Sequence, residues 1–128
     1  MFDGVYHIGY LVDDVDKAIS FYEATFGGEL VGRSIAGDGI SKMAFIRCGE
    51  TEVELIQPGD PARLGGRTGL IIDHVGYEVA DIDAAVAELR EKGVQFAAPA
   101  PHVNSMGARL IYLDSASTMG TRVHLTQR

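Results

Sequence analysis

The feature that most constrains this chain is an internal repeat. Residues 7–19, HIGYLVDDVDKAI, align with residues 74–86, HVGYEVADIDAAV, at an offset of 74 − 7 = 67 positions. Each copy begins with His-x-Gly-Tyr. Near the end of each copy, residues 53–57, VELIQ, match residues 123–127, VHLTQ, after a further shift of three positions. Self-similarity of this kind indicates a duplicated structural unit, here a module of about 55 residues.

The two copies predict the same order of elements within one compact domain. The first module is expected over residues 1–57 and the second over 73–128, joined by a Gly- and Pro-rich linker over 58–72. A helix follows the first strand of each module, beginning after the N-cap residues Asp14 and Asp81 and ending at glycines. Further strands are expected near 29–34, 41–48 and 51–57, and near 94–98, 108–114 and 121–127. The chain is therefore predicted to be an α+β protein of two tandem βαβββ modules.

Alternation of side chains along the strands separates polar from apolar residues. In each first strand one face is apolar and suits packing under a helix, whereas the histidine and the glycine share the other face. In each last strand the apolar residues flank a polar one that points away from the core. Four polar residues thus occupy equivalent places on the face away from the helices: His7, Glu54, His74 and His124. Imidazole nitrogens and a carboxylate oxygen suit a divalent transition metal, so these residues are candidate ligands.

The repeated module resembles the vicinal oxygen chelate superfamily. The resemblance is strongest in HIGYLVDDVDKAISFYEATFGGEL, VELIQP and DHVGYEVADIDAAVAELREKGVQF. This group includes glyoxalase I, methylmalonyl-CoA epimerase, extradiol dioxygenases and the bleomycin resistance proteins. The resemblance implies a curved half-barrel sheet with the helices outside. It also implies one divalent metal (Ni, Co, Zn, Mn or Fe) held by His7, Glu54, His74 and His124.

The fourth ligand position departs from the pattern of the enzymes that the chain most resembles. Epimerases and bacterial glyoxalase I carry a glutamate there, whereas this chain has His124. With Glu54 as the one anionic ligand, a dication would leave the coordination sphere net positive. Such a site favours a substrate that arrives as an anion or forms an oxyanion.

The resemblance implies a metal-dependent isomerase or lyase that transfers a proton through a metal-stabilised enolate. Glu54 and Asp38 are the candidate catalytic residues, with Asp38 nearest to the place of the expected base. Asp38 is alternatively an ordinary acid of the AGDGIS loop, with the base absent. Two alternatives stay open: a non-haem iron dioxygenase, and a metal-free protein that sequesters its ligand as bleomycin resistance proteins do.

Other residues carry weaker signals. Lys42 and Arg109 occupy matched repeat positions and could bind a substrate carboxylate, or they could be charges at strand edges. His102 lies in a loop-like segment and is expected at the surface. Cys48 is expected to be inert.

Amino-acid composition indicates which classes of binding partner and which cellular location to expect. The net charge is −7 without any Lys/Arg cluster, which argues against a nucleic-acid or acidic-membrane partner. No run of 18 or more apolar residues occurs, so no membrane span is expected. A single cysteine and the absence of a secretory pattern predict a cytoplasmic protein. We expect a small-molecule substrate, whose identity stays open, and a homodimer in which two chains could share ligands.

Overall fold

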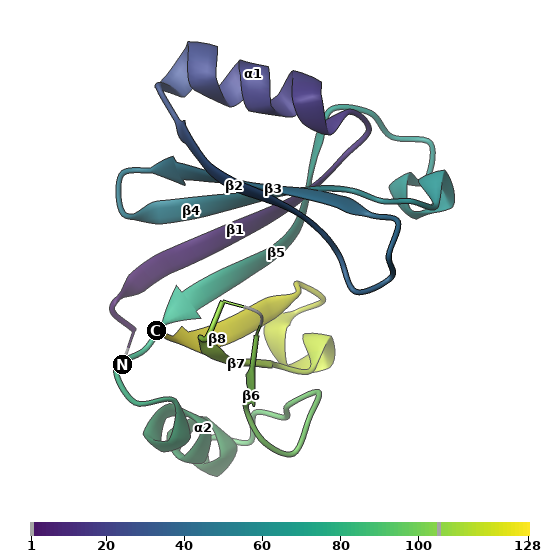
Figure 1. The fold of residues 1–128 in the computed structure, drawn as a ribbon. Helices are drawn as coiled ribbons and strands as arrows, with labels where there is room; N and C mark the ends of the chain where they lie inside the picture. Colours follow the sequence, from purple (N-terminus) through teal and green to yellow (C-terminus); the bar gives the residue numbers. More distant parts are fainter. Residues whose placement is uncertain (1, 105) are drawn as a thin grey trace. The chain divides into compact units, whose positions relative to one another are not determined.

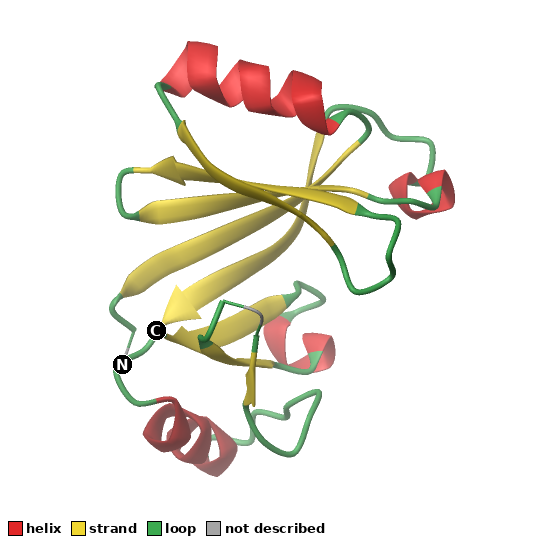
Figure 2. Ribbon diagram, in the orientation of Figure 1, coloured by secondary structure: helices red, strands yellow, loops and turns green. Residues whose placement is uncertain are grey.

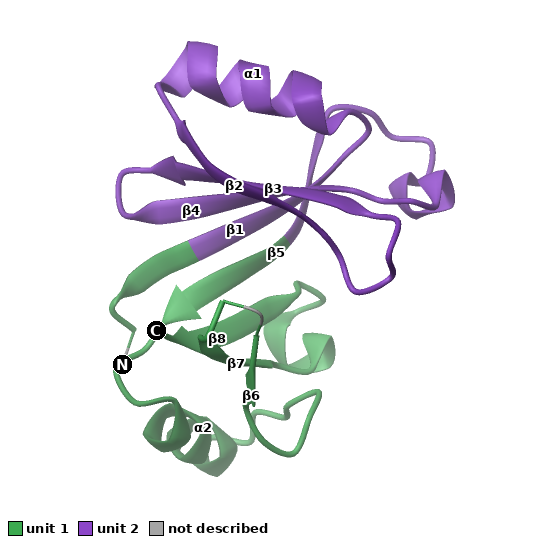
Figure 3. Cartoon of the chain, in the orientation of Figure 1, with its two compact units in different colours: residues 1–6, 74–128 green, residues 7–73 purple. Residues whose placement is uncertain are grey.

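The computed structural model describes residues 2–104 and 106–128 and divides into two compact units. One unit comprises His7–Asp73, and the other comprises His74–Arg128 with the N-terminal segment up to Tyr6 (Figure 3). Strands β1 and β5 each begin in one unit and end in the other.

Each repeat folds in the predicted order β-α-β-β-β, which confirms the α+β class and the two tandem modules (Figure 1). The first module consists of β1 (Gly4–Val12), α1 (Val15–Phe26), β2 (Glu29–Ile35), β3 (Lys42–Cys48) and β4 (Thr51–Gln57). The second consists of β5 (Leu70–Glu78), α2 (Ile82–Glu91), β6 (His102–Val103), β7 (Arg109–Tyr112) and β8 (Val123–Gln127). Two short 3₁₀ helices, η1 (Pro61–Leu64) and η2 (Ser115–Thr118), lie in the connections (Figure 2).

The strand order is the same in both modules. Hydrogen-bonded neighbours run β2-β3-β4-β1 in the first and β6-β7-β8-β5 in the second. The first and last strands of each module are parallel, pairing β1 with β4 and β5 with β8. Parallel pairing requires a crossover, which the rest of the module provides.

Both helices begin where the sequence predicts and are held by equivalent contacts. Asp14 accepts a hydrogen bond from the Lys17 amide, and Asp81 accepts one from the Ala84 amide, each at 3.0 Å. The last strand adds a second cap, because the Gln57 and Gln127 side chains accept hydrogen bonds at 2.9 Å from the first amides of α1 and α2. These contacts satisfy amides that have no partner within the helix.

Each module has its own core between its helix and one face of its strands. In the first module the buried cluster is Val12, Val15, Ala18, Ile19, Tyr22, Ala44, Ile46, Val53 and Leu55. In the second it is Val79, Ile82, Ala85, Val86, Ile111 and Leu125. These residues include the predicted apolar strand positions Val53, Leu55 and Leu125, so the predicted alternation of faces is confirmed.

The predicted strand near 94–98 is wrong. Phe96 forms an isolated bridge to Leu113, and the two-residue strand β6 comes later. Pro99 and Pro101 stand between the bridge and β6. Proline has no amide hydrogen to donate to a strand ladder, which explains why pairing stays short here.

The predicted linker contributes to packing. Leu64 of η1 is buried with Leu11 and Ile56, and Met43 and Ile71 pack against them.

None of the helices of the described residues has the length and apolar character that a membrane span needs.

Candidate functional site

Two of the predicted ligands lie side by side in the unit formed by His7–Asp73. The Nε2 atom of His7 lies 2.6 Å from Oε2 of Glu54, and their side chains are only 9% and 15% exposed. The register explains this proximity, because Glu54 on β4 is the partner of Gly9, two residues beyond His7 on the same face of β1. His7 and Glu54, two of the four predicted ligands, therefore lie together within one unit.

A second carboxylate lies on the other side of the His7 ring. Oε1 of Glu52 is 3.9 Å from Nδ1 of His7, and its side chain is 12% exposed. Glu52 was not among the predicted site residues, although its position two residues before Glu54 places both side chains on one strand face. Carboxylates beside the non-ligating nitrogen are a common means of orienting a metal-binding histidine.

The other two predicted ligands lie together in the second unit. The ring centroids of His74 and His124 are 5.5 Å apart, and both residues are only 4% exposed. His124 on β8 is the register partner of Gly76 on β5. A Cβ atom on Gly76 would lie 2.3 Å from Cε1 of His124, so the ring occupies space that only glycine leaves open.

Two further side chains hold these rings. Oγ1 of the buried Thr126 lies 2.7 Å from Nδ1 of His124. The Tyr112 ring lies 5.1 Å from His124 and 5.9 Å from His74 between centroids, and the Arg122 guanidinium lies 5.0 Å from the Tyr112 centroid. Thr126 and Tyr112 were not among the predicted site residues. Alternation from His124 would have placed Thr126 on its face, but no sequence signal marks Tyr112.

The chemistry of the four donors fits a divalent transition metal. Imidazole and carboxylate ligands bind such ions at about 2.0–2.2 Å, which places neighbouring donor atoms about 3 Å apart. The 2.6 Å separation of His7 Nε2 and Glu54 Oε2 is close to this value, so small rotations would direct both toward one ion. Burial of the three histidines removes the competition of bulk water for these nitrogens.

The comparison with known proteins now decides the family. The family model for the glyoxalase/bleomycin resistance protein/dioxygenase superfamily matches residues 6–112 of the chain. The chain belongs to this superfamily. The resemblance noted in the sequence is therefore confirmed.

Similar members of the superfamily are epimerases. The mitochondrial methylmalonyl-CoA epimerase of Bos taurus is 30% identical over 129 residues, covering 94% of this chain and 72% of the relative. The ethylmalonyl-CoA/methylmalonyl-CoA epimerase of Cereibacter sphaeroides is 28% identical over 127 residues, covering 94% of this chain and 95% of the relative. These similarities support a function of the epimerase or isomerase type.

Solved structures agree with this placement in the superfamily. The methylmalonyl-CoA epimerase of Mycobacterium tuberculosis matches with a TM-score of 0.84 and 25% identity, over 98% of this chain and 88% of that chain. A methylmalonyl-CoA epimerase in complex with methylmalonyl-CoA and NH₄⁺ gives a TM-score of 0.83 and 25% identity, over 99% and 95% of the two chains.

Asp38, the candidate base, is engaged within its own loop. Its carboxylate accepts hydrogen bonds from the Ile40 amide at 3.0 Å, from the Ser41 amide at 2.8 Å and from the Ser41 hydroxyl. The Ser41 hydroxyl also accepts a hydrogen bond from the Gly59 amide at 3.0 Å. Hydrogen bonding from Ser41 lowers the pKa of Asp38 to about 2. These contacts make Asp38 a weak base and favour its interpretation as a loop acid.

The two candidate substrate-binding residues lie on the helix side of their sheets. Arg109 forms two hydrogen bonds with the Asp83 carboxylate of α2, at 2.9 and 3.0 Å, and this contact lowers the pKa of Asp83. Lys42 alternates with the core residues Ala44 and Ile46, and it lines a surface hollow together with Val15 of α1. The structure therefore does not bring Lys42 to the strand face that carries His7 and Glu54. His102 is exposed, and Cys48 is a half-buried free thiol.

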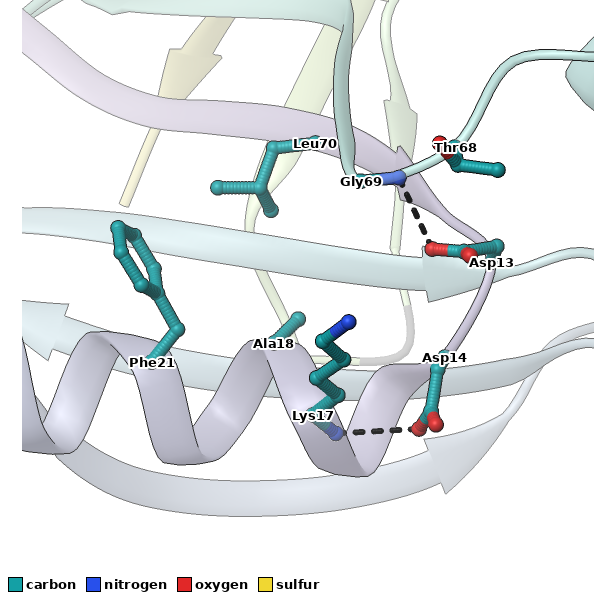
Figure 4. A pocket seen from close by; sticks show the side chains of 8 residues that line it. All are labelled: Asp13, Asp14, Lys17, Ala18, Phe21, Thr68, Gly69 and Leu70. Atoms are coloured by element: carbon teal, nitrogen blue, oxygen red, sulfur yellow. Dashed lines mark hydrogen bonds between the residues drawn. The ribbon is translucent and has the colours of Figure 1, made fainter.

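A separate hollow lies where α1 begins. Phe21, Ala18, Lys17 and Leu70 line it together with Asp13, Asp14, Thr68 and Gly69 (Figure 4). Asp13 accepts a hydrogen bond from the Gly69 amide at 3.0 Å, and the Asp14 carboxylate caps the helix. None of the predicted ligands lines this hollow.

Proposed function

We propose that this member of the superfamily is a metal-dependent epimerase, which removes and returns a proton at the carbon next to a thioester carbonyl. The observation that carries the proposal is the presence of two largely buried donor pairs, His7 with Glu54 and His74 with His124, in a chain that is 28–30% identical to methylmalonyl-CoA epimerases. Methylmalonyl-CoA is the first substrate to test, because the relatives are named for it.

His7, Glu54, His74 and His124 are proposed to hold one divalent metal. The bound metal would supply a Lewis acid that polarises the carbonyl and stabilises the negative charge that develops on its oxygen. Because Glu54 is the one carboxylate among the four, the occupied site would stay net positive. It would thus favour a substrate that carries its own carboxylate beside the thioester.

Glu54 is proposed to serve also as the acid–base residue. Its carboxylate is largely buried and already accepts an interaction from His7 at 2.6 Å, so Oε2 is a suitable atom to receive a proton. Leu11 and Ile56 lie two residues beyond Gly9 and Glu54 on the same strand faces, where Leu64 covers them. This apolar floor would exclude water from one side of the reacting carbon and so limit loss of the proton to solvent.

Proton exchange tests this proposal directly. The metal-reconstituted protein is incubated with methylmalonyl-CoA in D₂O, and deuterium at carbon 2 is followed by mass spectrometry together with the ratio of epimers. We expect metal-dependent deuterium incorporation that is lost in His74→Ala. Full exchange after thorough chelation would rule out the metal, and no exchange with any divalent metal would rule out the epimerase.

The histidine-rich donor set favours one second candidate, a non-haem iron dioxygenase. Three imidazoles and one carboxylate form a ligand set suited to Fe(II) with a position open for oxygen. Oxygen uptake with catechol-like or keto-acid substrates, together with no proton exchange, would favour this candidate. A metal-free protein that binds a ligand without converting it would match the sequestering alternative. The cytoplasmic location and the homodimer stay predictions.

A further inference from the structure

We infer that Thr126 is a positioning residue whose hydroxyl oxygen accepts a hydrogen bond from Nδ1–H of His124, which leaves Nε2 as the metal-binding atom of that histidine. The inference rests on the proposed metal site and adds a residue to it. Thr126 is only 1% exposed and His124 only 4%, so water does not compete for their contact.

The contact is short and allows two assignments of the hydrogen atoms. Oγ1 of Thr126 lies 2.7 Å from Nδ1 of His124. A neutral imidazole carries one hydrogen, on Nδ1 or on Nε2. If Nδ1–H donates to the hydroxyl oxygen, Nε2 keeps its lone pair for a metal. If the hydroxyl donates to Nδ1, the hydrogen lies on Nε2, and His124 would have to change tautomer before binding a metal there.

The surroundings of the ring restrict its orientation. A Cβ on Gly76 would lie 2.6 Å from Nε2 and 3.0 Å from Nδ1, so the ring rests against the Gly76 backbone. The Tyr112 ring packs against it with an interplanar angle of 63°. With the ring held this way, the contact of Nδ1 with Thr126 also fixes the direction of Nε2. A metal ligand held through its second nitrogen binds in one geometry, which strengthens binding.

The repeat provides an internal comparison. Glu54 and His124 are equivalent at an offset of 124 − 54 = 70, and the same offset relates Ile56 to Thr126, because 126 − 56 = 70. In the first module the ligand is a carboxylate, which has no tautomer to select, and the equivalent residue is the apolar Ile56. In the second module the ligand is an imidazole, and the equivalent residue carries a hydroxyl. The hydroxyl thus occurs where a tautomer must be chosen.

A pair of substitutions tests the inference. Thr126→Val keeps the shape and removes the hydroxyl, whereas Thr126→Ser keeps the hydroxyl and removes a methyl group. The ring ¹⁵N shifts of His124, assigned with a His124→Gln variant, report the tautomer in metal-free protein. Competition with a chelator gives the Zn²⁺ dissociation constant without any substrate. Thr68→Val, at an exposed threonine, is the control for threonine substitution in general.

The expected result is an Nδ1–H tautomer in the wild type that is lost or mixed in Thr126→Val. Zn²⁺ affinity should fall roughly 10- to 100-fold in that variant and return to near wild type in Thr126→Ser. A wild-type Nε2–H tautomer, or equal affinity of the wild type and Thr126→Val, would overturn the inference. Because neither readout uses the reaction, Zn²⁺ binding that depends on Thr126 without proton exchange would defeat the epimerase proposal alone. A wild type that binds no Zn²⁺ would overturn both.

Discussion

Gly76 and His124 are register partners on the parallel strands β5 and β8, and the His124 ring fills the space that a Cβ on Gly76 would need. The same register pairs Gly9 with Glu54 in the first module. Each glycine of the repeated His-x-Gly-Tyr therefore lies opposite the second donor of its own module. In the second module the motif therefore combines the proposed ligand His74 with the glycine that leaves room for the proposed ligand His124.

Replacing Gly76 with alanine should damage the His74–His124 pair. The added methyl group would lie 2.3 Å from Cε1 of His124, so the ring must move or the strands must separate. Overpacking of this kind typically lowers the free energy of unfolding by about 1–3 kcal/mol. Chemical denaturation and Zn²⁺ binding should both show the loss. Gly32→Ala is the matched control, because a Cβ there meets nothing within 4 Å. Equal Zn²⁺ affinity of Gly76→Ala and the wild type would contradict the assigned role of His124.

Replacing Glu54 with glutamine separates its two proposed roles. Glutamine keeps an oxygen donor of similar length but cannot take up a proton at neutral pH. If Glu54 is both ligand and acid–base residue, Glu54→Gln should still bind metal while deuterium exchange falls by about 10²- to 10⁴-fold. Metal content and exchange rate, measured on the same preparation, check this. Exchange at the wild-type rate would leave Glu54 as a ligand only.

Asp38→Asn should change stability more than catalysis, and the effect should depend on pH. Because hydrogen bonds lower the pKa of Asp38 from 3.8 to about 2 in the folded protein, its ionised form stabilises the fold above pH 3.8. That contribution disappears as the pH falls toward 2. The variant should therefore melt at a lower temperature than the wild type at pH 7, and the difference should shrink in acid.

Ser41→Ala provides the control for Asp38, since it removes the hydroxyl partner and leaves the carboxylate. It should lower the melting temperature at pH 7 in the same direction without slowing proton exchange. If Asp38→Asn alone abolished exchange while remaining folded, Asp38 would be the base after all.

The Arg109→Ala variant tests whether Arg109 binds substrate or only pairs with Asp83 of α2. Its guanidinium is paired with Asp83 by two hydrogen bonds, and exposed pairs of this kind contribute little to stability. The variant should show a small decrease in melting temperature and an unchanged KM for the thioester. Asp83→Ala should behave alike, and the double variant should lose little more. A large rise in KM confined to Arg109→Ala would restore the predicted role in substrate binding.

The repeat and the alternation of strand faces made much of this structure predictable. An offset of 67 residues aligned both first strands and both helices, and alternation from Val53 and Leu55 placed Glu54 on the opposite face. Alternation could also have placed Lys42 beside Ala44 and Ile46 on the helix face, and Thr126 beside His124. Both placements follow from the alternation of side chains between strand faces alone.

Other features depend on contacts that a sequence pattern does not specify. No strand forms near 94–98, because the two prolines that follow limit the hydrogen-bond ladder to an isolated bridge. The apolar residues of this segment therefore did not predict its structure correctly. The hydrogen bonds of Asp38 depend on how its loop closes over Ser41 and Gly59. Tyr112 lies against His74 and His124 because the β7–β8 register pairs it with His124. No sequence motif specifies this register.

The most direct test of the central claim is the metal content of protein purified without added metal, compared with that of His74→Ala. The proposal predicts about one nickel, cobalt, manganese or zinc ion per site, lost in the variant, with restored proton exchange on adding that metal. Iron with oxygen uptake would favour the dioxygenase instead. A wild-type protein that stays metal-free after reconstitution, or that exchanges the proton of methylmalonyl-CoA without metal, would contradict the account.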